Sequence, residues 1–158
     1  RVYGDAPRSD GDLKKYTPAG MKDYPISGGV RAIALADING DEHEDILVSD
    51  GWNYQYGKHA KARVRAYLGP DHKDVRTLAN FDEDYTVNAI YPVQFNKELA
   101  LIVQASHHVY LLEPDIASWK VHTIGPMDES GLIHISQTET AQTVLISGNP
   151  SLQLELPQ

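Results

Sequence analysis

Three short aliphatic runs, each leading into small or polar residues, recur along the 158-residue chain at 45–49, 101–105 and 144–148. Apolar runs also precede them at 30–35, 87–92 and 132–135, follow them at 63–68, 108–112 and 152–156, and in two cases continue at 75–78 and 119–124. Runs of this length, separated by Gly, Pro, Asn and Asp, are typical of antiparallel strands. The sequence therefore predicts an all-β chain built from a four-stranded unit, with strands A to D, that repeats every ~45–55 residues.

A repeat of this kind is typical of the blades of a β-propeller. We expect one propeller segment over 1–158: the end of a preceding blade at 1–20, complete blades at 28–80 and 86–125, and an incomplete blade at 131–158. About three blades do not close a ring of roughly four to eight. We therefore expect a larger ring, formed with the rest of a longer chain or by self-assembly. A β-sandwich of about ten strands is the alternative.

The segment 37–45, between strands A and B of the first complete unit, has the composition of a calcium loop. Oxygen-bearing side chains occupy its positions 1, 3, 5 and 9, the backbone carbonyl at position 7 supplies a fifth donor, and a glycine at position 4 permits a tight turn. Ca²⁺ prefers several such hard oxygen ligands. The expected ligands are Asp37, Asn39, Asp41, His43 through its backbone, and Asp45. The alternative is an acidic, solvated turn without an ion.

This segment carries a family resemblance. Together with the glycines at 28–29 and the runs at 45–48 and 63–69, it resembles one blade of the FG-GAP/VCBS repeat family, which includes the propellers of integrin α-subunits and many bacterial surface and secreted proteins. The resemblance implies one structural calcium ion held by the five residues above. The family usually has Gly where this chain has Glu42, a residue that disfavours a left-handed backbone. The equivalent segments 94–98 and 137–141 lack the acidic spacing, so we expect no calcium there.

A ligand-binding face is expected at the opposite end of the strands. In a propeller, the A–B and C–D connections share one face, and the B–C and D–A connections share the other. The B–C insertion 49–59 is rich in aromatic and amide side chains, and the D–A segments 82–85 and 128–129 add carboxylates. Such groups suit a glycan or a protein partner. The candidate ligand-binding residues are Trp52, Asn53, Tyr54, Tyr56, His59 and His107.

Two other interpretations of these residues remain open. Trp52 and Tyr54 would serve packing alone if the insertion lies on a neighbouring blade. His59 and His107 would form part of a zinc site if they met across blades, although the chain has no His-x-His or His-Glu-x-x-His spacing.

Charge and composition exclude several classes of function. The net charge of −8 disfavours nucleic acid as a partner. No apolar run approaches the ~20 residues that insertion into a membrane requires. There is no cysteine, and no nucleophile elbow, phosphate loop or dinucleotide fingerprint.

We therefore expect a non-catalytic, calcium-stabilised propeller module that binds a protein or glycan. It would work at the cell surface, outside the cell or in the periplasm, where millimolar calcium would keep the loop filled. The alternative is part of a carbohydrate-active propeller enzyme, of the polysaccharide lyase or sugar dehydratase type, with tyrosines and histidines of the candidate set around one pocket.

Overall fold

The computed structural model describes residues 30–50, 62–115, 118–127, 131–137, 141–147 and 151–157. Within these ranges the chain forms eleven strands and no helix, and so no helix suited to crossing a lipid bilayer. The strands are β1 (Ile33–Ala36), β2 (Asp45–Asp50), β3 (Ala62–Leu68), β4 (Asp74–Phe81), β5 (Val87–Phe95), β6 (Glu98–Ala105), β7 (His108–Pro114), β8 (Trp119–Pro126), β9 (Ile133–Gln137), β10 (Ala141–Ile146) and β11 (Leu152–Pro157).

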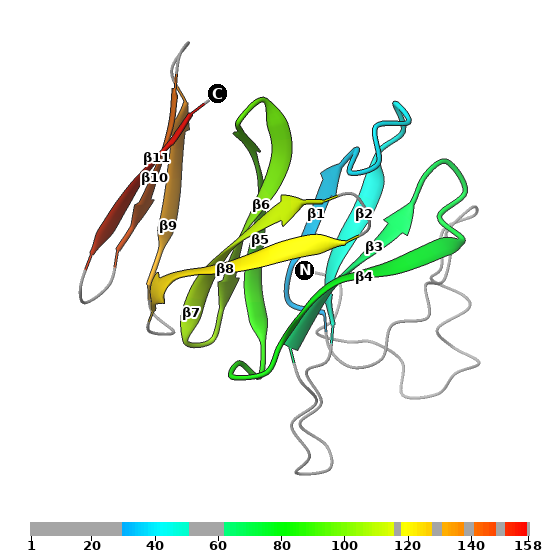
Figure 1. The fold of residues 1–158 in the computed structure, drawn as a ribbon. Helices are drawn as coiled ribbons and strands as arrows, with labels where there is room; N and C mark the ends of the chain where they lie inside the picture. Colours follow the sequence, from blue (N-terminus) through cyan, green and yellow to red (C-terminus); the bar gives the residue numbers. More distant parts are fainter. Residues whose placement is uncertain are drawn as a thin grey trace, which may run out of the picture.

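The strands form three antiparallel sheets in which each strand pairs with its neighbours in sequence (Figure 1). Sheet 1 contains β1–β4, sheet 2 contains β5–β8, and sheet 3 contains β9–β11. This confirms the expected all-β chain of antiparallel four-stranded units, with three strands in the last. The described strands form three sheets rather than the two facing layers of a β-sandwich, and they do not close a ring.

Sheet 2 is buried on both faces, which explains the unbroken apolar run in β6. Leu101 and Val103 face sheet 1, where they join a core that includes Val64 of β3. Ile102 faces sheet 3 and packs in a second core with Val144 of β10. Because successive side chains of a strand point to opposite faces, a strand between two sheets needs apolar residues at every position.

Sheet 1 approaches sheet 2 through small side chains. Ala32 is buried in the core between these sheets, and Ala34 and Ala36 of β1 pack against that core. The alternate residues Ile33 and Leu35 are 66% and 53% exposed. The largest aliphatic side chains of β1 therefore lie on the face of sheet 1 that is turned away from sheet 2.

Two buried glutamines connect sheet 2 to sheet 3. Nε2 of Gln104 donates a hydrogen bond to the carbonyl of Gly131 at 2.9 Å, and Oε1 of Gln142 accepts one from the amide of Gln94 at 2.9 Å. The first bond joins sheet 2 to the residues just before sheet 3, and the second joins sheet 3 to the backbone of β5 in sheet 2. Because a buried amide side chain needs hydrogen-bond partners, these contacts fix how the two sheets align.

A serine at the same position clamps one end of each sheet. The amides of Ser49, Ser106 and Ser147, just after or at the end of the second strand, donate to the carbonyls of Ala32, Thr86 and Leu132, just before the first strand. Each hydroxyl oxygen also accepts a backbone amide from the same segment, at 2.8 Å from Ala32, 3.2 Å from Tyr85 and 2.9 Å from Leu132. The three sheets are therefore equivalent in these bonds as well as in strand order.

Strand boundaries differ from the expected ones where side chains intervene. β1 begins at Ile33 rather than at residue 30, because the amides of Arg31 and Ala32 donate to the Ser49 hydroxyl. The expected loop at 94–98 is only a two-residue turn, since Asn96 and Lys97 both adopt positive φ angles, of 52° and 65°. Turns with two left-handed residues match the twist of a hairpin and allow the strands to extend. The expected strand at 1–20 lies outside the described residues.

The serine clamps make a graded prediction about stability. Ser49 is buried, so Ser49→Ala leaves two backbone amides without their acceptor and should lower the free energy of unfolding by about 1–3 kcal/mol. Ser147→Ala is the matched control, because Ser147 is exposed and water can replace its hydroxyl; its cost should stay below about 1 kcal/mol. Urea unfolding measures both. Equal costs would contradict a role for buried amide satisfaction.

Candidate functional site

The connections between strands gather at two ends of the molecule, and each end carries a polar cluster. The β1–β2, β3–β4, β5–β6 and β7–β8 connections lie at what we call the acidic end, which contains the segment 37–45 (Figure 1). The end of β2, the start of β3, and the β4–β5 and β6–β7 connections lie at the opposite end, which we call the Asp84 end. Antiparallel pairing produces this division, because consecutive connections must alternate between the two ends.

At the acidic end, the β1–β2 connection curls around the carboxylate of Asp37. Oδ1 of Asp37 accepts hydrogen bonds from the amides of Gly40 at 2.8 Å and Asp41 at 3.1 Å, and Oδ2 accepts one from Glu42 at 2.9 Å. Asp41 repeats the pattern on a smaller scale by accepting the amide of His43 at 2.9 Å. The segment thus forms the tight turn that its sequence predicts.

Asp45 anchors this connection to the rest of sheet 1. Its side chain is fully buried, and its two carboxylate oxygens accept the amides of Ile38 at 2.8 Å and Gly69 at 2.7 Å. Gly69 follows β3, so Asp45 joins the β1–β2 and β3–β4 connections. A Cβ atom at Gly69 would lie 2.8 Å from Cβ of His43, so only glycine permits this close approach.

The carboxylates of this segment have no cationic partner among the described residues. No Lys or Arg there forms an ion pair with Asp37, Asp41, Glu42, Glu44 or Asp45. Burial favours a raised pKa for Asp37, but hydrogen bonds from the amides of Glu42, Gly40, Asp41 and Asn39 outweigh it and hold the pKa below its usual value. The carboxylate is therefore ionised at neutral pH, and its charge is balanced only by amide dipoles.

The oxygen donors of this segment are of the type that binds a hard cation, but they do not converge on one point as a complete coordination shell. The side chains of Asp37, Asn39, Asp41 and Asp45 supply oxygen atoms, the ligand type that Ca²⁺ prefers. Within the described part of the chain, however, no three His, Asp or Glu side chains converge as a metal site. The oxygens instead accept amides of their own loop and, at Asp45, the amide of Gly69 after β3. A carboxylate oxygen with one hydrogen bond retains a lone pair for a cation.

The backbone of the loop is strained at one residue. Glu42 has a φ of 67°, in the left-handed region that favours glycine, and Gly40 has a φ of 76°. A side chain in this region costs about 1–2 kcal/mol, whereas glycine has no such penalty.

Glu42→Gly should therefore stabilise the fold. After the extra chain entropy of glycine is subtracted, we expect a gain of about 0.5–1 kcal/mol in the free energy of unfolding. Gly40→Ala makes the reverse change, because it places a side chain on a left-handed residue of the same loop. It should lower the free energy of unfolding by about 1 kcal/mol. Chemical denaturation measures both, and a loss of stability in Glu42→Gly would show that the strain is relieved by other contacts.

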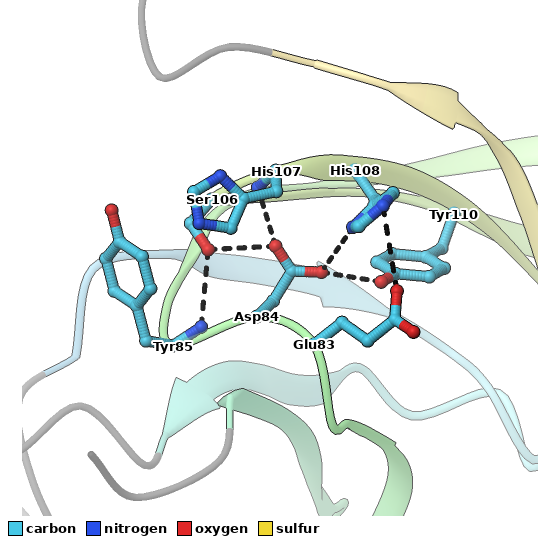
Figure 2. A network of polar contacts seen from close by, with 7 residues as sticks. All are labelled: Glu83, Asp84, Tyr85, Ser106, His107, His108 and Tyr110. Carbon is cyan, nitrogen blue, oxygen red and sulfur yellow. Dashed lines mark hydrogen bonds and ion pairs between the residues drawn. The ribbon is translucent and has the colours of Figure 1, made fainter.

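The second polar cluster surrounds Asp84, in the connection between β4 and β5 (Figure 2). Its side chain is buried and accepts four hydrogen bonds. Oδ1 accepts the Ser106 hydroxyl at 2.8 Å and the His107 amide at 2.6 Å, and Oδ2 accepts the Tyr110 hydroxyl at 2.5 Å and Nδ1 of His108 at 3.1 Å. All four donors come from the β6–β7 hairpin, so one carboxylate fastens sheet 2 to the end of sheet 1.

These bonds decide the protonation states in the cluster. Burial favours a raised pKa for Asp84, but the donors from Tyr110, His107, Ser106 and His108 outweigh it and lower the pKa below the ordinary value. Burial raises the pKa of Tyr110 strongly, and the neighbouring Asp84 carboxylate adds to the rise. The pair is therefore held as carboxylate and neutral phenol over the whole physiological range.

His107 lies in the β6–β7 turn and His108 is the first residue of β7, and their rings have different partners. The His108 ring lies between Asp84 and Glu83, with Nε2 at 3.8 Å from the Glu83 carboxylate. The His107 side chain is exposed, and its ring meets the Tyr85 ring edge-on with centroids 5.3 Å apart (Figure 2). The β4–β5 connection, expected as a D–A segment, thus contacts the β6–β7 connection, expected as a B–C segment. His107 lies where the two meet.

The other candidate ligand-binding residues cannot be placed in the same way. Trp52, Asn53, Tyr54, Tyr56 and His59 lie outside the described residues. Their segment joins β2 to β3, and the amide of Ala62, at the start of β3, donates to the carbonyl of Asp84 at 3.2 Å. The zinc and enzyme interpretations both need His59 and therefore stay predictions.

Sequence analysis missed the organising role of Asp84. It lies in an acidic run with Asp82 and Glu83, and nothing in that run marks one carboxylate as buried. The available signal was the pair His108 and Tyr110, two residues apart on β7 and so on one face, each able to donate to a common acceptor.

Asp84→Asn should destabilise the fold by about 3 kcal/mol at neutral pH, because it places an NH₂ group against donors in a buried site. Since the folded pKa lies below the unfolded value, this stability is present above about pH 4 and is lost as the pH falls through the folded pKa. The free energy of unfolding of the variant should therefore fall less steeply than that of the original protein as the pH is lowered. Urea titrations from neutral to acidic pH measure this.

Asp74→Asn is the control for that experiment, because Asp74 forms an exposed pair with Arg76 and should contribute less than about 1 kcal/mol. A similar loss in both variants would indicate a general effect of net charge. If the free energy of unfolding of Asp84→Asn fell with decreasing pH as steeply as that of the original protein, the assigned protonation state would be contradicted.

Comparison with known proteins identifies no relative: no protein-family model, no curated protein and no solved structure gives a significant match to the chain.

Proposed function

We propose that the chain is a segment of a calcium-stabilised β-propeller and acts as a non-catalytic binding module. The observation that carries this proposal is the equivalence of three consecutive meanders, each closed at the same end by the same serine bonds. Repeated four-stranded units placed face to face are the construction principle of a propeller.

The outer face of sheet 1 supports a larger ring. Ile33 and Leu35 project from β1 on the face opposite sheet 2. In a propeller this face would lie against a preceding blade, supplied by a longer chain or by another copy. Exposed aliphatic side chains at two alternate positions of one strand favour such burial.

The acidic end supports the calcium component. Five carboxylates within nine residues have no Lys or Arg partner in the described structure, and mutual repulsion makes such a cluster costly without a cation. Asp37, Asn39, Asp41, the His43 carbonyl and Asp45 would hold the ion. When bound, the ion would neutralise the loop and stabilise the folded state, since the unfolded chain has no such site. Such a role fits an extracellular, surface or periplasmic location.

The Asp84 end is the proposed ligand-binding face. The rings of Tyr85 and His107 meet there, on a framework held by a buried carboxylate. β2 ends and β3 begins at the same side, which favours a role for the candidate residues between them. Flat rings beside carboxylates and amides suit a glycan or a protein surface.

Calcium addition should raise the melting temperature of metal-free protein, with a dissociation constant below the millimolar range. Asp41→Asn should weaken binding by about tenfold or more, because one charged ligand is lost. Asp74→Asn, at the same end but outside the loop, should leave calcium binding unchanged. Calorimetric titration and thermal melts with and without chelator measure both effects. No binding at millimolar calcium would overturn the structural-ion proposal and leave the fold assignment standing.

A further inference from the structure

A groove of about 580 Å³ lies at the acidic end, between sheet 1 and sheet 2. One wall is the start of the β1–β2 connection, and the other is formed by β6 and the end of β7. The lining residues are Asp37, Ile38, Asn39, Gly40, Glu98, Leu99, Pro114 and Asp115. The groove is distinct from the proposed ligand-binding face, which lies at the opposite end of the strands.

The lining combines apolar and anionic surface. Ile38, Leu99 and Pro114 are half-buried and supply an apolar contact surface. Asp37, Glu98 and Asp115 add three carboxylates from three different connections or strand ends, and no Lys or Arg is among the described residues that line the groove. A long aliphatic chain that ends in a cation would match both parts, because such a side chain can lay its methylene groups on apolar surface while its charged head meets carboxylates.

Basic residues near the groove do not neutralise it. Lys120 pairs with Asp115 at 3.2 Å, but this pair is substantially exposed and is worth only about 0–1 kcal/mol. A partner's cation can therefore replace Lys120 at low cost. Glu98 has no ion-pair partner among the described residues.

We propose that this groove receives a Lys or Arg side chain of a partner protein. Charge complementarity selects the occupant: the groove, the neighbouring loop and the net charge of −8 all favour a basic group. Arg is able to form paired hydrogen bonds with a carboxylate, whereas Lys contributes a point charge. The acidic end would thus be a second interaction surface, with Glu98 and Asp115 acting independently of any calcium bound by the loop.

Peptide titrations followed by NMR test the proposal. Three short peptides of Gly and Ser carry a single central Arg, Lys or norleucine, and each is added to the full chain at low salt, with excess calcium and again with chelator. The Arg and Lys peptides should shift the amide signals of Glu98, Leu99 and Asp115. The norleucine peptide should bind at least about fivefold more weakly, because it has the alkyl chain without the charge.

Charge reversal supplies the matched control. Glu98→Lys should weaken binding of the basic peptides by about fivefold or more, whereas Glu83→Lys, the same change at another exposed position at the Asp84 end, should alter it less than about twofold. Equal effects of the two variants, shifts outside the groove, or equal binding of the norleucine peptide would overturn the proposal. The calcium response of Glu98→Lys should remain intact, so failure of the groove and failure of the calcium loop give different results.

Discussion

At each end of this molecule, one buried carboxylate holds neighbouring connections together by accepting backbone amides. Asp45 joins two connections of sheet 1, and Asp84 joins the last connection of sheet 1 to the hairpin of sheet 2. A buried carboxyl group is costly unless its oxygens find hydrogen-bond donors, so Asp45 and Asp84 favour the arrangement of loops that supplies those donors. The positions of both candidate sites follow from this requirement.

The serine clamps add a level of order that repeats with the sheets. The amides of Ser49, Ser106 and Ser147 donate to equivalent carbonyls, and their hydroxyls accept one or both amides of the same two-residue segment. Only Ser106 also donates to a carboxylate, that of Asp84. In the described structure, the second unit thus extends a hydrogen bond shared by all three units into a larger polar network around Asp84.

Strand content and order were predictable because they depend on local patterns. The apolar runs gave all eleven described strands, and their spacing gave the three sheets. Boundaries were less accurate because they depend on contacts such as the Ser49 bonds to Arg31 and Ala32. Asp84 was not identified because burial of one acid in a run of three is decided by donors more than twenty residues away. Composition predicted the curl of 37–45, since Asp and Asn accept nearby amides in any tight turn.

The two ends differ in how their charge is compensated, and this difference has a consequence for function. At neutral pH, Asp84 is compensated internally by two hydroxyls, an amide and an imidazole, so the framework beneath Tyr85 and His107 needs no cation from solution. The acidic end relies on amide dipoles alone, and its remaining charge attracts whatever cations the surroundings supply. A cation from solution, bound in the loop, and a basic side chain of a partner, bound in the groove, would both neutralise part of this negative charge. In the described structure, the acidic end therefore keeps a negative charge that cations from the surroundings can screen, whereas the charge of Asp84 is met by donors inside the protein.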